Sequence, residues 1–230
     1  MEREHPFIAQ LTAARRTARR RRLRLALVAA GLGLLLAPLA VADATAQQTR
    51  SCAVAALQGE AALERAGQRQ TVVVGTVLTA DDRLLSFREA RVEIRCNDGV
   101  RINIGADTRL ELATLVGPPR TSRSVVMRLL EGIVRVALPA VRSWRHFEVQ
   151  TPTAVASVRS TDWIVQTAKD GATAVFVVEG QVLAADRAGS KGAFLNAGEG
   201  IDFAADGSMA ASVVWGEARV KRTLAAVAPR

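Results

Sequence analysis

Residues 151–167, TPTAVASVRSTDWIVQT, contain the group of polar side chains best able to do chemistry in this chain of 230 residues. Four polar residues stand between two apolar, strand-like runs: Arg159, Ser160, Thr161 and Asp162. Together with His146, Ser160 and Asp162 would supply the nucleophile, base and acid of a hydrolase. However, the chain has no Gly-x-Ser-x-Gly elbow, and nothing in the sequence brings His146 close to Ser160. We therefore expect no catalytic site and no enzyme.

The same residues fit a corner between strands better. Thr151-Pro152 ends one strand, because proline donates no hydrogen bond to a sheet. Thr161 and Asp162 can bond to backbone groups left free where the chain changes direction, and Arg159 can pair with Asp162 or with a glutamate. The sequence predicts that residues 159–162 form the corner and that Trp163 returns to the core.

The sequence predicts no metal site and no cofactor. His146 is the only histidine after residue 46, the two cysteines are far apart, and the carboxylates are not clustered. Metal sites in proteins combine three or more such ligands at short spacing.

The N-terminus has the organisation of an export signal. Eight arginines lie in residues 1–24, followed by the apolar run LALVAAGLGLLL, Pro38 and the small-residue triplets AVA and ATA. This order is typical of a cleaved signal peptide over residues 1–46. The apolar stretch of residues 25–42 is also just long enough for an uncleaved anchor, in which case residues 23–42 would contact the inner membrane. Both interpretations place the rest of the chain outside the cytoplasm.

Most of the positive charge belongs to this leader. Eight Arg against two Glu in residues 1–42 account for +6 of the formal net charge of +9, which leaves +3 for the remainder. A nucleic-acid partner is therefore not expected, since proteins that bind nucleic acids carry their basic residues on the folded domain. In an oxidising compartment Cys52 and Cys96 would form a disulfide; otherwise they are two buried free thiols.

Residues 53–207 read as an all-β domain of short antiparallel strands. Alternating runs such as RVEIR and VRINI, and doubly apolar runs such as AVFVV, are separated by turn signals such as Asn97-Asp98-Gly99. The segments ALQGEAAL, LLEGIVRV and VVEGQVLA form a weak repeat in which glycine suits a bulge or a tight reversal. The pattern allows either a sandwich or a stacked, solenoid-like arrangement.

Residues 208–230 form a basic tail that is either a short amphipathic helix or a frayed terminus. A protein interface has two candidate positions. One is a free sheet edge that pairs with a partner strand. The other is the segment VRSWRHF, because tryptophan and arginine often anchor interfaces; its candidate residues are Arg142, Trp144 and Arg145.

Taken in order, these motifs resemble the FecR domain family. The matching elements are Thr151-Pro152, Val158-Arg159-Ser160-Thr161, Asp170-Gly171, Glu179-Gly180-Gln181-Val182 and Ala197-Gly198. The likeness covers about residues 57–207. It implies an exported, non-catalytic β-domain, whose best-known members relay a signal from an outer-membrane iron-siderophore transporter to a sigma factor.

The chain departs from the family's regulators in three ways. Ser160 stands where the family has glycine, a short basic segment stands in place of a cytoplasmic sigma-binding domain, and little chain follows residue 207. We therefore expect a periplasmic FecR-like module of the cell envelope that senses a signal or binds a protein partner. The alternatives are a single-pass inner-membrane regulator of the sigma-factor-regulator type and an envelope structural or glycan-binding protein.

Overall fold

The computed structural model of the chain describes residues 50–115, 124–139, 146–158 and 161–228. Seventeen strands and one short helix lie among these residues, so the predicted all-β class is confirmed. The apolar helix predicted near the N-terminus lies outside the described residues. None of the helical structure that is described is long and apolar enough to cross a membrane.

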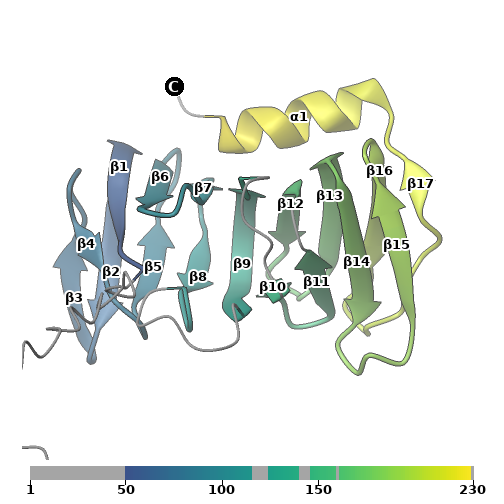
Figure 1. Cartoon of the computed structure of the whole chain (residues 1–230), viewed down its shortest axis with the longest axis horizontal. Coiled ribbons are helices and arrows are strands. Elements are labelled where there is room, and N and C mark those ends of the chain that lie inside the picture. Colours follow the sequence, from purple (N-terminus) through teal and green to yellow (C-terminus); the bar gives the residue numbers. More distant parts are fainter. Residues whose placement is uncertain (1–49, 116–123, 140–145, 159–160, 229–230) are drawn as a thin grey trace, which may run out of the picture. The chain divides into compact units, whose positions relative to one another are not determined.

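The strands form two sheets that share β9 (Ser124–Ala137), the longest strand (Figure 1). The first, called the covered sheet, has the order β4 (Val77–Leu78), β1 (Cys52–Gln58), β6 (Arg91–Cys96), β7 (Arg101–Ile104), β9, β12 (Asp162–Thr167), β13 (Thr173–Glu179), β16 (Glu199–Phe203) and β17 (Val213–Val214). The second, called the open sheet, has the order β3 (Gln68–Thr71), β2 (Ala61–Arg65), β5 (Arg83–Ser86), β8 (Arg109–Glu111), β9, β10 (His146–Gln150), β11 (Ala154–Val158), β14 (Gln181–Asp186) and β15 (Gly192–Asn196). Among these pairs only β9 and β10 run parallel.

The two sheets bury one shared core. Alternate residues of each strand face inward, so Ile94 and Ile102 of the covered sheet belong to the same apolar cluster as Leu84 and Val149 of the open sheet. The chain passes from one sheet to the other after every one or two strands. The fold is therefore a sandwich of two sheets whose chain winds from one sheet to the other, as in a solenoid. It combines the two arrangements that the sequence allowed.

Glycines from the weak sequence repeat stand where the chain changes sheet. Gly59 joins β1 to β2, Gly180 joins β13 to β14, and Gly132 lies within β9 where its pairing passes from β8 to β12; all three have positive φ. At Gly132 (φ 99°) a Cβ would lie 2.2 Å from the hydroxyl oxygen of Thr108. That hydroxyl accepts a hydrogen bond from the Ile133 N–H (3.0 Å) and donates one to the Gly105 carbonyl (3.1 Å). Only glycine fits this crossing.

The C-terminal tail forms helix α1 (Glu217–Val227), which packs on the outer face of the covered sheet (Figure 1). Phe176 stacks on Trp215 with ring centroids 4.8 Å apart, and Arg219 lies 3.5 Å above the Trp215 ring. Arg219 also pairs with both carboxylate oxygens of Asp202, at 2.5 and 2.8 Å. The helix therefore belongs to the same compact unit as the strands, and the frayed alternative for residues 217–227 is wrong.

The predicted disulfide between Cys52 and Cys96 is confirmed. The two cysteines are register partners on β1 and β6, and both are buried. The bond fixes the covered sheet close to its β4 edge.

Candidate interaction face

A single row of residues crosses all nine strands on the outer face of the open sheet. Each member is the register partner of the next. The row consists of Arg69, Glu64, Arg83, Glu111, Arg128, Gln150, Val155, Ala185 and Gly192. Its first five members alternate in charge, and its last three are apolar. The face thus changes in character from charged to apolar along the sheet.

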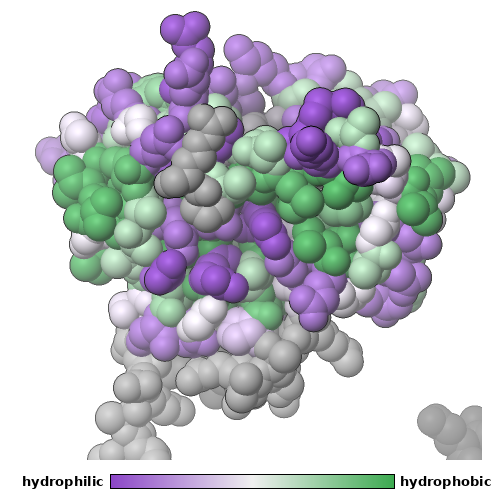
Figure 2. Space-filling view, turned by 90° about the horizontal axis from the view of Figure 1, so that it is seen from above, coloured by the Kyte–Doolittle hydropathy of each residue, from purple (hydrophilic) through white to green (hydrophobic). Residues whose placement is uncertain are grey.

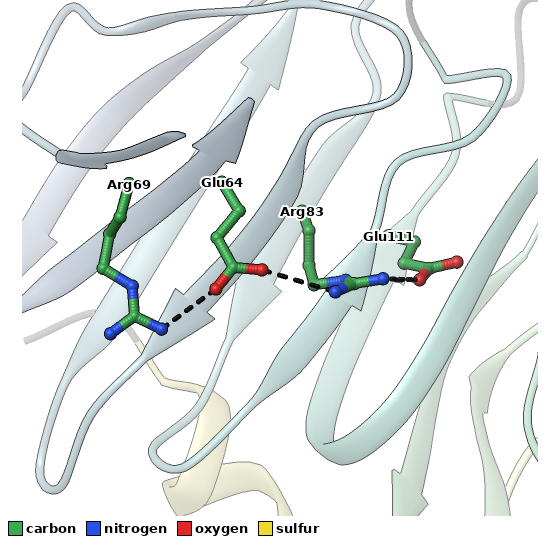
Figure 3. Close-up of polar contacts among 4 residues, drawn as sticks. All are labelled: Glu64, Arg69, Arg83 and Glu111. Carbon is green, nitrogen blue, oxygen red and sulfur yellow. Dashed lines mark hydrogen bonds and ion pairs between the residues drawn. The ribbon is translucent and has the colours of Figure 1, made fainter. Parts of the chain in front are cut away.

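The charged part of the row, called the ladder, is a chain of ion pairs (Figure 3). Arg69 Nη2 lies 2.9 Å from Glu64, and Arg83 bridges Glu64 and Glu111 at 3.3 and 2.5 Å. Arg128 follows at 3.7 Å from Glu111. The hydrogen bond from Arg69 is the largest of the effects that hold the pKa of Glu64 below its usual value, with Arg83 adding to it and burial opposing it. Opposite charges side by side on neighbouring strands stabilise this face modestly.

A buried carboxylate anchors the turn beneath the ladder. Asp82 is fully buried and accepts two hydrogen bonds of 2.8 Å from Arg65, together with bonds from the N–H (2.7 Å) and hydroxyl (2.9 Å) of Thr79. Burial acts to raise the pKa of Asp82, but the bonds from Arg65 and Thr79 outweigh it and hold that pKa below its usual value. The ion pair of Asp82 with Arg65 therefore fixes the turn before β5, the strand that carries Arg83 of the ladder.

The apolar end of the face lies over β11, β14 and β15. Leu183 and Phe194 are register partners there, and the Phe194 side chain is one of the most exposed large apolar groups among the described residues, at 65%. Val155 and Ser157 of β11 continue this surface as half-buried residues. Figure 2 shows hydrophobic residues at both ends of the opposite, helix-bearing side. Val213 and Val214 of β17, and Val73 and Val74 before β4, are more than half exposed.

Two of the hydrolase residues considered from the sequence, His146 and Asp162, have other partners. His146, on the open sheet, contacts the carboxylate of Glu148, which also accepts a hydrogen bond from Gln150 at 2.6 Å. Asp162, on the covered sheet, accepts hydrogen bonds from Nε and Nη2 of Arg135 at 2.8 and 2.6 Å. Ser160 lies outside the described residues, as does Arg159. In the described part of the chain, no three His, Cys, Asp or Glu side chains gather as metal ligands.

The motif residues around residue 151 lie at turns. Thr151 and Thr153 are buried between β10 and β11, next to the Gly171 turn (φ 89°) that joins β12 to β13. The Thr153 hydroxyl donates to the Gly171 carbonyl at 2.7 Å, and the Thr173 hydroxyl donates to the Thr151 hydroxyl at 2.9 Å. Pro152 is exposed at the tip of its turn. These residues tie two neighbouring turns together.

The chain passes from β11 in the open sheet to β12 in the covered sheet between residues 158 and 162. The buried hydroxyl of Thr161 donates to the Gln181 carbonyl at 2.9 Å, and Trp163 is fully buried against Phe147. Of the remaining motif residues, Glu179 ends β13 beside Gly180, and Gly198 (φ 84°) turns the chain from β15 to β16.

The proposed interface residues Arg142, Trp144 and Arg145 lie outside the described residues. Sequence reasoning missed the ladder. Its signal was present, because these strands of the open sheet each place at least one charged residue at an outward position, as in LER, DRLLS, RLEL and MRLL. Only the strand order, however, shows that these charges alternate in sign along one row.

Residues 82–183 match the family model described as "FecR protein", which confirms the resemblance drawn from the sequence. The matched segment runs from the turn before β5 into β14 and so contains most of the open face. Among curated proteins, none matches this chain.

Two crystal structures from Parabacteroides distasonis ATCC 8503, each described as "a putative anti-sigma factor", share the fold. The structure at 1.65 Å is 20% identical, with a TM-score of 0.51, and the alignment covers 64% of this chain and 65% of that one. The structure at 2.50 Å is 19% identical, with the same TM-score and coverage of 62% and 63%. The chain thus spans less than two thirds of those structures, and the likeness concerns the fold.

Proposed function

We propose that this FecR-domain protein is a non-catalytic signalling or sensing module of the bacterial cell envelope, and that it acts by binding a protein partner across the outer face of the open sheet. The observation that carries the proposal is the difference between the two outer faces. Helix α1 packs on one of them, whereas the other presents a nine-strand row that changes from alternating charge to apolar residues. Such a mixed surface suits recognition of a protein, with apolar contacts for affinity and charges for orientation.

Export to the periplasm is part of the proposal. The basic and apolar leader supports it, and so does the Cys52–Cys96 disulfide, because disulfides persist in oxidising compartments. The N-terminal sequence and intact mass of the protein from separated soluble and membrane fractions test it. A soluble mature protein that starts near Asp43 or Gln47 is expected, and a full-length protein found only in the cytosol would overturn it.

A second arrangement is favoured by one observation, the likeness in fold to a protein described as "a putative anti-sigma factor". In this arrangement residues 23–42 stay in the inner membrane as an anchor, and the arginine-rich N-terminal segment meets a cytoplasmic regulator such as a sigma factor. The same fractionation separates the two. An intact Met1 start in the membrane fraction supports the anchored form.

Transcript profiling tests the signalling role. We expect deletion of the gene to change the transcription of a confined set of genes, and wild-type protein to restore it. Arg128→Glu and Val155→Lys, placed mid-face, should fail to restore it, whereas Lys221→Glu on the exposed surface of α1 should succeed. Unchanged transcription after deletion would exclude signalling, and full restoration by the mid-face variants would exclude this face.

A further inference from the structure

The edge strands of the two sheets are protected to different degrees. Within the described residues, the covered sheet ends in β4 and β17, which are only two residues long. The open sheet ends in β3, whose four residues are all polar and include Arg69, and in β15, whose sequence GAFLN has no charge and no proline. Short or charged edges resist pairing with another strand, and long, uncharged ones invite it. Among these four edge strands, only β15 is both longer than two residues and free of charged side chains.

The backbone groups that β15 offers at its edge follow from its pairing with β14. The Asp186 N–H bonds to the Lys191 carbonyl at 2.9 Å, which makes Asp186 and Lys191 a hydrogen-bonded pair. Since such pairs alternate along an antiparallel ladder, Ala193 and Leu195 bond to β14, whereas Gly192, Phe194 and Asn196 direct their N–H and C=O groups outward. The Asn196 N–H is bound by the Glu199 carboxylate at 2.7 Å. The usable edge therefore consists of the N–H and C=O groups of Gly192 and Phe194.

We propose that β15 pairs with β15 of a second copy of this chain, antiparallel, about a two-fold axis at Ala193. In this register Gly192 of each copy faces Phe194 of the other, and the four outward groups of each copy all find partners across the axis. The Glu199 carboxylate blocks the next position and so ends the ladder at this length.

The side chains of β15 are self-complementary in the same register. Gly192 and Phe194 both lie on the outer face, because they are two residues apart on one strand. The exposed Phe194 ring of one copy would therefore cover the Gly192 of the other, where there is no side chain, as aromatic residues do beside glycines in sheets. The Glu199 carboxylate lies at the Asn196 N–H. The register places Asn196 of one copy opposite Ser190 of the other, beside Lys191, so opposite charges lie near each other at both ends.

The dimer would place two open faces side by side in one continuous sheet. Because only one short strand from each copy takes part, we expect a weak dimer that forms at high local concentration.

Disulfide trapping and sedimentation of the purified full-length chain in mild detergent test the dimer. At the proposed axis the Cα atoms of the two Ala193 residues would be roughly 4.5 Å apart, within reach of a disulfide. Ala193→Cys should therefore give a cross-linked dimer under mild oxidation. The matched control, Thr71→Cys on the exposed edge strand β3, should give none.

Sedimentation measures the association without a cross-link. Phe194→Lys and Phe194→Pro should raise the apparent dissociation constant at least tenfold, since the first removes the ring contact and the second the Phe194 N–H; Thr71→Lys should leave it unchanged. Circular dichroism and thermal melting verify that each variant is folded. Equal cross-linking of the two cysteine variants, a wild type that stays monomeric at every concentration, or association that is indifferent to both Phe194 variants would overturn the proposal.

Discussion

The two sheets share a core and a strand, yet different interactions stabilise them. In the covered sheet a disulfide within the shared core joins β1 to β6, and a helix on the outer face buries Phe176 and Trp215. The outer face of the open sheet has ion pairs between partly exposed side chains, the contacts of His146 and Gln150 with Glu148, and an apolar end. A disulfide or a buried aromatic side chain contributes several kcal/mol, whereas an exposed ion pair contributes about 0–1 kcal/mol. The strongest stabilising interactions therefore lie in the covered sheet, which leaves the residues on the outer face of the open sheet available for binding.

The largest test of this contrast is removal of the disulfide. We expect the double variant Cys52→Ala/Cys96→Ala to lose about 4 kcal/mol of unfolding free energy, because the bond closes a long loop in the unfolded chain. Urea denaturation measures the loss. Wild type with a reducing agent should behave like the variant, and the variant itself should be insensitive to that agent. A loss below about 1 kcal/mol would mean that sheet pairing alone holds β1 to β6.

A pair of aromatic substitutions compares the two outer faces directly. Trp215→Ala should cost about 3 kcal/mol, because the side chain is 6% exposed and its removal opens a cavity between α1 and Phe176. Phe194→Ala on the open face should cost less than about 0.5 kcal/mol at concentrations where the chain is monomeric. Urea midpoints with unchanged slopes check both values. Similar losses would show that the open face also contributes to stability.

A structural feature could be predicted from the sequence where neighbouring residues determine it, but not where the order of the strands does. Turn residues and two-residue alternation predicted the all-β class, and the glycine repeat marked the crossing points between sheets, because both signals are local. The disulfide was predicted from the expected export and from the presence of two cysteines in the sequence. The ladder was out of reach, because Glu64, Arg83 and Glu111 meet only through pairings set by the whole fold. Phe194 likewise gained importance only once β15 was seen to lie at an edge.

Acid titration tests the buried charge of the open sheet. Asp82→Asn should cost about 2 kcal/mol near pH 7, because it weakens the charge-assisted bonds to Arg65 and Thr79. The folded pKa of Asp82 is lowered, so this contribution is present above the unfolded value of about 3.9 and is lost as the pH falls through the folded pKa. Wild type and variant should therefore converge in acid. The exposed neighbour provides the control: Asp81→Asn should change the unfolding free energy little near pH 7. A constant difference between wild type and Asp82→Asn down to pH 2 would show that shape, not charge, matters at Asp82.

The smallest expected effect concerns the ladder itself. Glu111→Gln removes the charge between Arg83 and Arg128 and should cost about 0.5 kcal/mol at low salt, with less lost at high salt, because half-exposed charges are screened. Thermal melts at two salt concentrations measure this, with Glu60→Gln as the exposed control outside the ladder. If the loss were equal at both concentrations, Glu111 would act through packing. If it exceeded about 2 kcal/mol, the ladder would hold the open sheet as firmly as α1 holds the covered one, and the division between a stabilised face and a binding face would fail.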